Sequence, residues 1–433
     1  MKLVIVGTGY VGLVSGACFA EFGYKTICVD KDKDRIEKLN SGKCPFYEPG
    51  MDDLLSKHLK NTKLLTFSSS LKESMIDADI VFITVGTPSR RLEDEADLSF
   101  VWTVADEISQ NINSYCVVVT KSTVPVGTSK EIKKIINKKI AKDKFDIVSN
   151  PEFLREGSAI NDFMRPDRVV IGTDCNKSEE IMRELYRPLF LRETPIVSTT
   201  IETSEIIKYA SNSFLATKIG FINEIADLCE VVGADVQDVS KAMGIDNRIG
   251  SKFLNAGPGY GGSCFPKDVI AFSSTAKRNG VDLSILKSVH NSNNNRIKKI
   301  GDKIINKING GSLICFLGLS FKPNTDDIRE SVSIKLIKKL APKVKSLTLY
   351  DSLAIPNAKE ALRGIPNINF SKQKYSNFHK INGLIICTED KEFINPRISE
   401  LKKLKDEVIF DGRNILERET LEKNNIHYEG VGV

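Results

Sequence analysis

A short apolar strand that leads directly into Gly7-Thr8-Gly9-Tyr10-Val11-Gly12 is the feature that most restricts how this chain folds. The strand is expected over Lys2–Val6, and a helical pattern follows the glycines. In such a turn Gly7 permits the tight bend, Gly9 lets the backbone approach a pyrophosphate, and Gly12 lets the helix pack closely on the strand. The N–H groups at the start of the helix then attract phosphate oxygens. The sequence therefore predicts a βαβ unit that binds a dinucleotide.

Asp30 follows the second expected strand, Lys25–Val29, at about the twenty-residue spacing that is typical of such units. A carboxylate here accepts hydrogen bonds from ribose hydroxyls and repels a 2′-phosphate, so NAD is the expected cofactor rather than NADP. Arg35 either weakens this preference or stacks on the adenine. The alternatives to an NAD site are a flavin site and a purely structural turn.

Short apolar strands alternate with helical patterns as far as about residue 195, which predicts βαβ units and a mostly parallel sheet. The strands are expected at Lys2–Val6, Lys25–Val29, Ile80–Val85, Cys116–Thr120, Ile147–Ser149 and Arg168–Ile171. A second series is expected at Ser312–Leu317, Ser346–Tyr350, Gly383–Cys387 and Glu407–Phe410. Between the two series, apolar residues at three- and four-residue steps predict a helix from Thr203 to Val232, capped by Gly233. The polar run Asn291-Ser292-Asn293-Asn294-Asn295 predicts a linker, a turn or a helix start.

The predicted fold class is α/β, with two Rossmann-like domains that contain parallel sheets and are joined by a long central helix. We expect an NAD-binding domain at residues 1–195, a central helical region with the cysteine loop at 196–300, and a second α/β domain at 301–433. A helix of about thirty residues exceeds the usual globular length, so it is expected to join domains and to carry a subunit interface.

The composition excludes several other classes of protein. No apolar run is long enough to span a bilayer, and the lysines behind the net charge of +6 are not interleaved with aromatic residues as on a single-strand nucleic-acid surface. The nine cysteines include no Cys-x-x-Cys pair, and the four histidines lack zinc-ligand spacing. We therefore expect reduced thiols, a cytoplasmic location, and no metal, membrane or nucleic-acid partner. The mild basicity suits an anionic small substrate.

One cysteine lies in a glycine-rich frame, Gly257-Pro258-Gly259-Tyr260-Gly261-Gly262-Ser263-Cys264-Phe265-Pro266-Lys267-Asp268. The glycines are expected to keep the backbone open, so that something large lies against it. Cys264 presents a thiol to that space, and a thiol attacks a carbonyl at neutral pH once its pKa is modestly lowered. A buried structural cysteine is the alternative, as expected for Cys18, Cys28 and Cys315.

Polar residues also gather at the ends of expected strands. Val85-Gly86-Thr87-Pro88 and Lys121–Thr128 leave the first sheet at the edge where ligands of parallel sheets collect. Asn150–Gly157 follows another strand and carries two carboxylates. On the central helix, Lys208 and Asn212 are four residues apart and share one face.

The strings Asn150-Pro151-Glu152-Phe153-Leu154-Arg155-Glu156-Gly157 and Gly261-Gly262-Ser263-Cys264-Phe265-Pro266-Lys267-Asp268 are highly specific, and with them the chain resembles the UDP-glucose/GDP-mannose dehydrogenase family. The resemblance extends from the N-terminal glycines through Phe321–Ser331 to Asp411-Gly412-Arg413. It implies an NAD-dependent enzyme that oxidises the CH2OH group of a nucleotide sugar to a carboxylate, with the nucleotide sugar bound by residues 301–433.

The resemblance also implies roles for single residues. Cys264 resembles the family's nucleophile. The residues that resemble its acid–base and oxyanion group are Lys208, Asn212, Asp268, Thr123 and Glu152. The expected cofactor contacts are Gly7, Gly9, Tyr10, Val11, Gly12, Asp30, Arg35, Gly86, Thr87, Thr123, Glu156, Lys267 and Arg329. The expected substrate contacts are Glu152, Phe153, Leu154, Lys208, Asn212, Arg248, Phe253, Asn255, Gly261, Phe321, Lys322 and Arg413, with Arg248 reaching a neighbouring subunit.

The implied reaction explains why a cysteine is needed. Oxidation of an alcohol to an acid removes four electrons, so two hydrides must leave in turn to two NAD molecules. A thiol holds the aldehyde as a thiohemiacetal, and the second hydride transfer leaves a thioester that water hydrolyses. We expect Lys208 and Asn212 to stabilise the oxyanion, Asp268 to accept protons through a water, and Glu152 to activate the hydrolytic water.

Within the family, Phe265-Pro266 and the whole-length similarity favour UDP-glucose as substrate and UDP-glucuronate as product, in a homodimer or higher homo-oligomer. The alternatives are a sister enzyme for GDP-mannose, UDP-N-acetylmannosamine or UDP-N-acetylglucosamine, and a catalytically silent binding protein. A thiol acyltransferase would not explain the dinucleotide turn. Ordinary alternatives for single residues are a helix N-cap for Thr123, helix N-terminal carboxylates for Glu152 and Glu156, and surface cations for Lys208, Arg248 and Arg413.

Overall fold

The computed structural model describes residues 1–88, 95–190, 193–308, 311–375, 378–404 and 408–433. The chain divides into two compact units. The first unit comprises Met1–Ser211 and Ser274–Gly280, and the second comprises Asn212–Ser273 and Val281–Val433.

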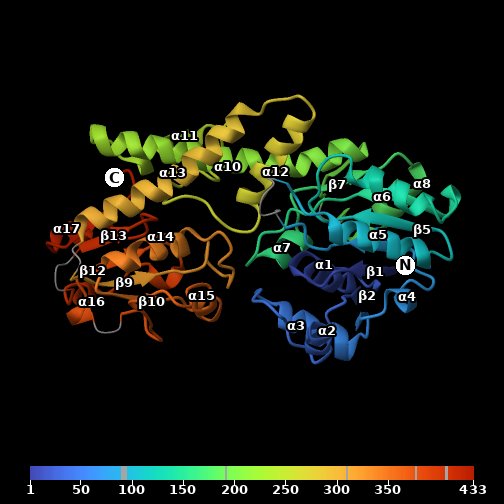
Figure 1. Ribbon diagram of the computed structural model, residues 1–433, viewed down its shortest axis with the longest axis horizontal. Helices are drawn as coiled ribbons and strands as arrows, with labels where there is room; N and C mark the ends of the chain where they lie inside the picture. Colours follow the sequence, from blue (N-terminus) through green and yellow to red (C-terminus); the bar gives the residue numbers. More distant parts are fainter. Residues whose placement is uncertain (89–94, 191–192, 309–310, 376–377, 405–407) are drawn as a thin grey trace. The chain divides into compact units, whose positions relative to one another are not determined.

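Helix α10 (Ile201–Val232) continues from the first unit into the second (Figure 1). It confirms the helix predicted from Thr203 to Val232. Gly233 directly after it has a φ of +74°, the left-handed conformation that favours glycine at a helix end.

In the described part of the first unit, eight strands form one sheet in the order β3-β2-β1-β4-β5-β6-β7-β8. The strands are β1 (Lys2–Val6), β2 (Lys25–Val29), β3 (Leu65–Ser68), β4 (Ile80–Ile83), β5 (Cys116–Thr120), β6 (Phe145–Ser149), β7 (Val169–Gly172) and β8 (Ile196–Thr199). Neighbouring strands are parallel except β6 and β7, which are antiparallel. The first six strands have the order typical of dinucleotide-binding folds, which confirms the predicted Rossmann-like domain.

The two edge strands of this sheet, β3 and β8, were missed by the sequence pattern. β3 alternates between buried and more exposed residues, and β8 is at least partly exposed along its whole length. An edge strand therefore lacks the continuous apolar run that identifies a central strand of a parallel sheet.

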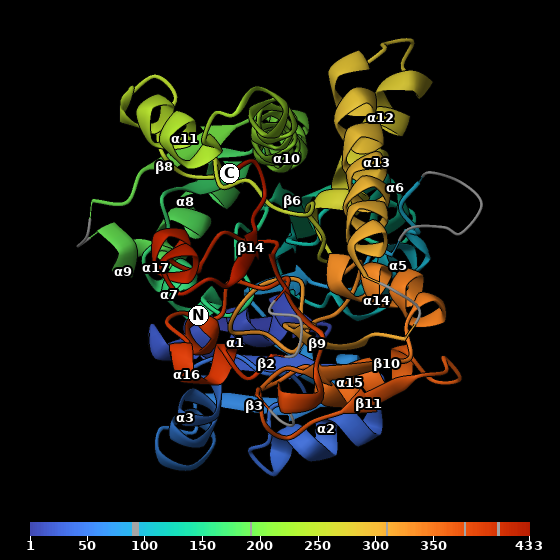
Figure 2. The ribbon, with the colours of Figure 1, turned by 90° about the vertical axis from the view of Figure 1, so that its left-hand side faces the viewer.

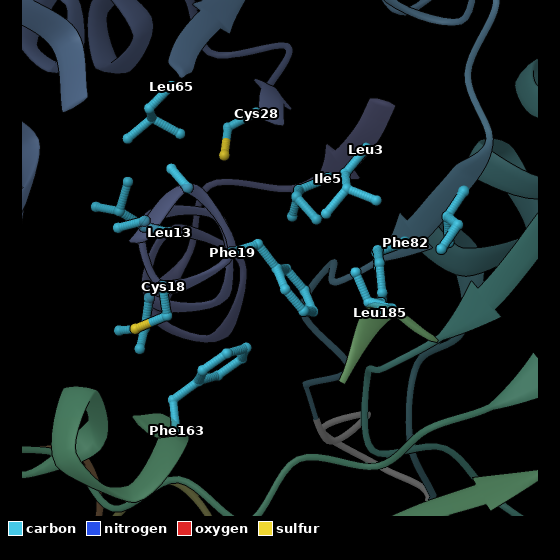
Figure 3. Close-up of a cluster of buried hydrophobic side chains, with 14 of the residues drawn as sticks. Leu3, Ile5, Leu13, Cys18, Phe19, Cys28, Leu65, Phe82, Phe163 and Leu185 are labelled. Carbon is cyan, nitrogen blue, oxygen red and sulfur yellow. The ribbon is translucent and has the colours of Figure 1, made fainter. Parts of the chain in front are cut away.

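Helices cover both faces of the first sheet. They are α1 (Tyr10–Glu21), α2 (Lys33–Asn40), α3 (Met51–Ser56), α4 (Leu71–Ser74), α5 (Ser99–Asn111), α6 (Thr128–Asn137), α7 (Ala159–Met164), α8 (Asn176–Leu185) and α9 (Arg187–Phe190). Because side chains alternate along a strand, Leu3 packs into a cluster with α1, α3, α7 and α8, whereas Val4 packs into another with α5 and α6. Figure 3 shows the first cluster, in which the Phe19 ring of α1 lies 5.2 Å from that of Phe82 and 5.0 Å from that of Phe163, centroid to centroid.

In the described part of the second unit, six strands form a wholly parallel sheet in the order β11-β10-β9-β12-β13-β14. Figure 2 labels β9, β10, β11 and β14 of this sheet. The strands are β9 (Leu313–Leu317), β10 (Ser346–Tyr350), β11 (Ile368–Phe370), β12 (Gly383–Ile386), β13 (Val408–Asp411) and β14 (His427–Glu429). Counted along the chain, this order equals that of the first six strands of the first sheet, so the second Rossmann-like domain is confirmed. The short edge strands β11 and β14 were missed, and the predicted start of β13 at Glu407 lies outside the described residues.

The helices that begin in the second unit are α11 (Val236–Ile245), α12 (Phe265–Arg278), α13 (Ser284–Lys307), α14 (Val332–Leu340), α15 (Ile355–Ala361), α16 (Ile398–Leu401) and α17 (Arg418–Lys423). The predictions for the polar run 291–295 were wrong, because it lies inside α13. Asn293 is buried there and bonded to the backbone of Tyr260, a tertiary contact that outweighs the weak helix propensity of asparagine. Among the described residues, no helix is long and apolar enough to cross a membrane.

Candidate active site

The turn after β1 has the geometry that a dinucleotide requires. Gly7 has a φ of +103°, and a Cβ on Gly12 would lie only 1.8 Å from Gly7 O, so both positions require glycine. Within the described ranges, no atom comes within 4 Å of the place that a Cβ on Gly9 would take. The backbone is thus open at the amino end of α1, where N–H groups attract phosphate, and the turn fits the pyrophosphate of NAD.

Asp30 lies directly after β2 and is tied to the same turn. Its Oδ2 accepts hydrogen bonds from Thr8 N and Thr8 Oγ1, both at 2.8 Å, and Arg35 Nη1 lies 3.3 Å from that oxygen. Burial alone would raise the pKa of Asp30, but hydrogen bonds from Thr8 and Asp32 outweigh it and hold the pKa below its ordinary value. Asp30 therefore stays a carboxylate, the acceptor that a ribose hydroxyl needs, and Arg35 pairs with it.

Glu48, which the sequence pattern did not reveal, joins the glycine turn to the segment after β6. Its Oε2 accepts from Gly157 N and its Oε1 from Ala159 N, both at 2.7 Å, and Tyr10 OH also donates to it. Burial and the hydrogen bond to Glu48 raise the pKa of Tyr10, so this hydroxyl stays protonated. Glu48 therefore provides the negative charge at the amino end of α7.

Glu152 and Lys208 form a buried ion pair in the first unit. Lys208 Nζ lies 3.0 Å from Glu152 Oε1, and the two side chains are only 4% and 6% exposed. Leu154 N donates to the other oxygen of Glu152 at 2.5 Å. Lys208 Nζ and the Arg168 guanidinium lie 5.3 Å and 3.5 Å from the centroid of the Phe153 ring. Lys208 is thus not a surface cation, and Glu152 is held by Lys208 instead of capping a helix.

A further buried cation, Lys121, follows β5, and its place directly after a wholly buried strand was the available signal in the sequence. Its Nζ donates to Asn150 Oδ1 at 3.1 Å and to Tyr186 OH at 3.3 Å, and burial lowers the pKa of Lys121 to about 8. Two residues on, Thr123 O accepts from Thr87 Oγ1 at 2.9 Å, so the loops after β4 and β5 meet. The other predicted cofactor residues of the first unit are Val11 in α1, Gly86 in the loop after β4, and Glu156 in the segment after β6.

The second unit contains the cysteine and another buried carboxylate. Asn212 Nδ2 donates to Asp268 Oδ2 at 2.6 Å, Lys267 Nζ donates to Asp268 Oδ1 at 2.7 Å, and Asp268 is 1% exposed. Cys264 lies directly before α12, and its backbone oxygen accepts from Asp268 N at 2.8 Å. Its Sγ lies 3.6 Å from Ser263 Oγ, and the residue is half-buried. The structure therefore brings Cys264, Lys267, Asp268 and Asn212 together at the start of α12.

The glycines of the cysteine frame have close neighbours within the second unit, which corrects the expectation of an open backbone. A Cβ on Gly261 would lie 2.3 Å from Glu330 O, and one on Gly262 would lie 2.7 Å from the Phe321 ring. Gly262 N also donates to Arg329 O at 3.1 Å. These two glycines are therefore required because the segment after β9 packs against them.

Several predicted substrate residues lie along the same frame. A Cβ on Gly257 would be 2.9 Å from Arg413 Nη1, and Arg413 Nε donates to Cys387 O at 2.9 Å. Lys322 Nζ lies 5.4 Å from the centroid of the Phe321 ring. Phe253, whose φ is +66°, has its ring 6.1 Å from that of Phe265, and Asn255 two residues further on is exposed.

Arg248 and Arg329 lie on the surface of the second unit. The Arg248 side chain is 88% exposed and pairs with Asp246 at 2.6 Å. Arg329 is 63% exposed and pairs with Asp327 at 2.7 Å, and its backbone carbonyl contacts the cysteine frame. Among the residues that the structure describes, no group of three His, Cys, Asp or Glu side chains is arranged to hold a metal ion.

The glycine turn with Asp30 bonded to it, set on a Rossmann sheet and followed by a second sheet with the strand order of the first six strands, defines an NAD-dependent oxidoreductase. Three family models match successive parts of the chain. They describe the NAD binding domain, central domain and UDP binding domain of the UDP-glucose/GDP-mannose dehydrogenase family, at residues 1–190, 202–295 and 315–418. The chain belongs to this family.

Relatives and solved structures agree with this assignment. The UDP-glucose 6-dehydrogenase of Rhizobium meliloti is 47% identical over 100% of this chain and 99% of its own length. UDP-glucose 6-dehydrogenase TuaD of Bacillus subtilis is 42% identical over 100% of this chain and 93% of its own length. The solved UDP-glucose dehydrogenase of Pyrobaculum islandicum superposes with a TM-score of 0.89 at 32% identity, covering 100% of this chain and 97% of its own.

Proposed function

We propose that the protein oxidises UDP-glucose to UDP-glucuronate, with two NAD reduced per sugar. The observation that carries this proposal is the half-buried Cys264 at the start of α12, one turn from the buried, hydrogen-bonded Asp268. Oxidation of an alcohol to an aldehyde uses no thiol, whereas a thiol lets the oxidation continue to an acid through a covalent acyl intermediate. The names of the full-length relatives at 47% and 42% identity support UDP-glucose over other nucleotide sugars.

The balanced reaction joins one CH2OH group, two NAD+ and one water to give one carboxylate, two NADH and three protons. NAD, when bound at the glycine turn, accepts one hydride in each oxidation. Cys264 Sγ adds to the aldehyde carbon and later leaves it when water attacks the thioester, so the thiol is regenerated. The partial positive charge at the amino end of α12 favours the negative sulfur in this cycle.

Asp268 is the proton acceptor in this proposal. Its two oxygens accept from Asn212 and from Lys267, which fix the orientation of the carboxyl group. The Asn212 amide has two N–H groups. One of them donates to Asp268, and we assign the other to the oxyanion that develops on the sugar carbon.

Glu152 activates water for thioester hydrolysis, and Lys208 stabilises the oxyanion together with Thr123. The 3.0 Å ion pair supports a coupled role, because each of these two buried side chains holds the other in place. In the second unit, Arg413, Lys322 and Phe321 are assigned to the nucleotide of the substrate. Their position along the cysteine frame and the family's UDP binding domain at residues 315–418 support this assignment.

The oligomeric state proposed is a homodimer or a higher homo-oligomer that forms through α10. Phe214, Phe221 and Leu228 recur every seven residues on this helix and are 65%, 49% and 55% exposed. An apolar row of this kind on a helix surface is typical of a protein interface. The 88% exposure of the Arg248 side chain supports its proposed contact with a neighbouring subunit. Mass in solution by light scattering tests this proposal, and a Phe221→Glu variant is expected to be monomeric.

We also propose a division into three domains and a cytoplasmic location. The domains are 1–195 for NAD, 196–300 for the central helix and cysteine loop, and 301–433 for the nucleotide sugar, and the family matches at 1–190, 202–295 and 315–418 support this division. A cytoplasmic location is supported by nine cysteines that are all free thiols.

The decisive experiment counts NADH per sugar consumed, with UDP-glucose, GDP-mannose and UDP-N-acetylhexosamines offered separately. Two NADH per UDP-glucose is the expected result, and one NADH or a clear preference for another sugar contradicts the proposal. Cys264→Ala should retain NAD binding but form no acid. Cys175→Ala is the matched control, since that cysteine is also only half-buried and lies in the first unit.

A further inference from the structure

The start of the cysteine frame is held by buried side chains from α10 and α13 of the second unit. Asn223 Oδ1 accepts from Gly257 N at 2.8 Å, and Arg296 Nε donates to Gly257 O at 2.6 Å. Tyr260, three residues after Gly257, is held in the same way: Asn293 Oδ1 accepts from Tyr260 N at 2.9 Å, and Asn293 Nδ2 donates to Tyr260 O at 3.1 Å. Both backbone polar groups of Gly257 and both of Tyr260 are thus bonded to side chains.

These three side chains form one buried network. Asn223, Asn293 and Arg296 are 3%, 5% and 4% exposed. Arg296 Nη1 donates to Asn223 O at 2.7 Å and pairs with Asp227, so the arginine links α13 to α10 as well as to the frame. Loss of one member leaves a buried polar group without its partner, which makes the geometry of the network stringent.

The network lies close to the thiol along the chain. Only Gly261, Gly262 and Ser263 separate Tyr260 from Cys264, and the two glycines are packed against the segment after β9, which leaves this stretch little room to compensate for a shift of Tyr260. After the cysteine, the backbone is fixed again by the hydrogen bond from Asp268 N to Cys264 O. The position of Tyr260 therefore sets where the short stretch up to the cysteine begins.

We propose that Asn293, Arg296 and Asn223 are positioning residues that fix the Cys264 thiol for attack on the substrate carbonyl. This inference rests on the proposed role of Cys264 as nucleophile. None of the three needs to touch substrate or cofactor; they act through the backbone of Gly257 and Tyr260. A misplacement of about 1 Å in such a site costs on the order of 100-fold in rate.

Asn293→Asp provides a test that a merely structural role would not pass. A protonated Asp offers one acceptor and one donor, as asparagine does, whereas an ionised Asp turns an acceptor toward Tyr260 O. The variant should therefore lose about 100-fold in kcat at pH 8.5, and its kcat relative to wild type should recover at least about tenfold by pH 5.5. Asn295→Asp is the matched control, because it introduces the same carboxylate at an exposed position of α13 and should match wild type at each pH.

A second readout needs no substrate. Alkylation of Cys264 by iodoacetamide, followed at the Cys264 peptide by mass spectrometry, should differ at least about fivefold between Asn293→Asp and wild type at pH 8.5 and converge at pH 5.5. NAD affinity should stay within about twofold, since the glycine turn belongs to the first unit. If wild type does not oxidise UDP-glucose, the proposed function fails, but the alkylation ratio still decides the positioning role.

The proposal is overturned if the ratios of Asn293→Asp to wild type, in kcat and in Cys264 alkylation, stay constant with pH or equal those of Asn295→Asp. Should Asn293→Asp not fold, Arg296→Lys supplies the test. It keeps a positive charge for Asp227, but one nitrogen replaces the separate Nε and Nη1 donors of Gly257 O and Asn223 O. The expected result is about a tenfold loss of kcat with KM within about threefold, and unchanged kcat and alkylation overturn the proposal.

Discussion

The two sheets share one strand order but use the turn after their first strand differently. Both turns begin with a glycine of positive φ, +103° at Gly7 and +86° at Gly318. Gly7 is followed within three residues by α1, whose amino end is left open for a dinucleotide, whereas Gly318 is followed by α14 only at Val332. The longer segment of the second unit instead packs Phe321 against the cysteine frame. A shared topology thus supports a cofactor site in one unit and the support of the cysteine frame in the other.

The aspartate after the second strand of each sheet shows the same division of roles. Asp30 Oδ2 accepts from the backbone and hydroxyl of Thr8 in the glycine turn. Asp351 accepts from four backbone N–H groups. Leu319 N and Ser320 N donate to Oδ2, and Leu353 N and Ala354 N, directly before α15, donate to Oδ1. Asp30 therefore serves the cofactor turn, and Asp351 joins two loops of its own unit. A place in the sheet does not by itself assign a function.

The largest effect should come from Gly12→Ala in the short turn. The added methyl group would lie 1.8 Å from Gly7 O, so we expect the first unit to lose more than about 4 kcal/mol of stability and NAD binding to vanish. Trp102 of α5 is the single tryptophan of the chain, and its fluorescence reports unfolding of this unit. Gly9→Ala is the control, because its methyl group meets no described atom within 4 Å. The unfolding transition followed by Trp102 fluorescence should match that of wild type, while NAD binds about 10- to 100-fold more weakly. Normal NAD binding by Gly12→Ala would contradict the packing role.

Asp351→Asn should affect stability rather than cofactor binding. The amide replaces one acceptor oxygen with a donor that faces two backbone N–H groups, which costs about 3 kcal/mol. In urea unfolding, we expect far-UV circular dichroism to show the loss, while the Trp102 transition and NAD affinity stay near wild type. A variant with wild-type stability would show that these hydrogen bonds are dispensable.

Asp30→Asn should give the converse result. We expect NAD to bind about tenfold more weakly, which is about 1.4 kcal/mol, and the discrimination against NADP to shrink because the repelling charge is gone. The Trp102 unfolding midpoint should change little, since the amide oxygen still accepts from Thr8. Isothermal titration with NAD and NADP measures both quantities, and an unchanged ratio of the two affinities would sink the ribose assignment.

The sequence predicted most of what local pattern determines. The central strands of both sheets, α10 with its Gly233 end, and the NAD site followed from apolar runs and glycine spacing, which act over short distances along the chain. The edge strands β3, β8, β11 and β14 were missed because an edge strand needs apolar residues on one face only. Glu48, Lys121 and Asn293 were missed because their partners lie far away in the sequence, so no spacing rule reveals them.

The ends of the fifth strands give the most specific test of the contrast between the two units. β5 is followed by buried Lys121, whose pKa burial lowers to about 8, and β13 ends at buried Asp411, whose pKa burial raises. The two residues therefore give stability opposite slopes with pH. Asp411 contributes most below the ordinary aspartate pKa, and this contribution is lost as the pH rises through its raised folded-state pKa.

Lys121→Met isolates the effect in the first unit. Below pH 8 the folded protein bears the full cost of burying the charged lysine. Between pH 8 and 10.5, the ordinary pKa of lysine, the folded protein binds fewer protons than the unfolded chain, so stability rises with pH. Methionine keeps the apolar stem, and Asn150 Oδ1 keeps its 2.6 Å hydrogen bond from Tyr186 OH. We expect the variant to be more stable at pH 7 by on the order of 2 kcal/mol, and to lose the rise between pH 8 and 10.5 in the Trp102 transition. Lys38→Met, on the exposed surface of α2, is the control and should change neither the stability at pH 7 nor its rise with pH. A Lys121→Met protein that is less stable than wild type at pH 7 would mean that the surroundings stabilise the buried charge.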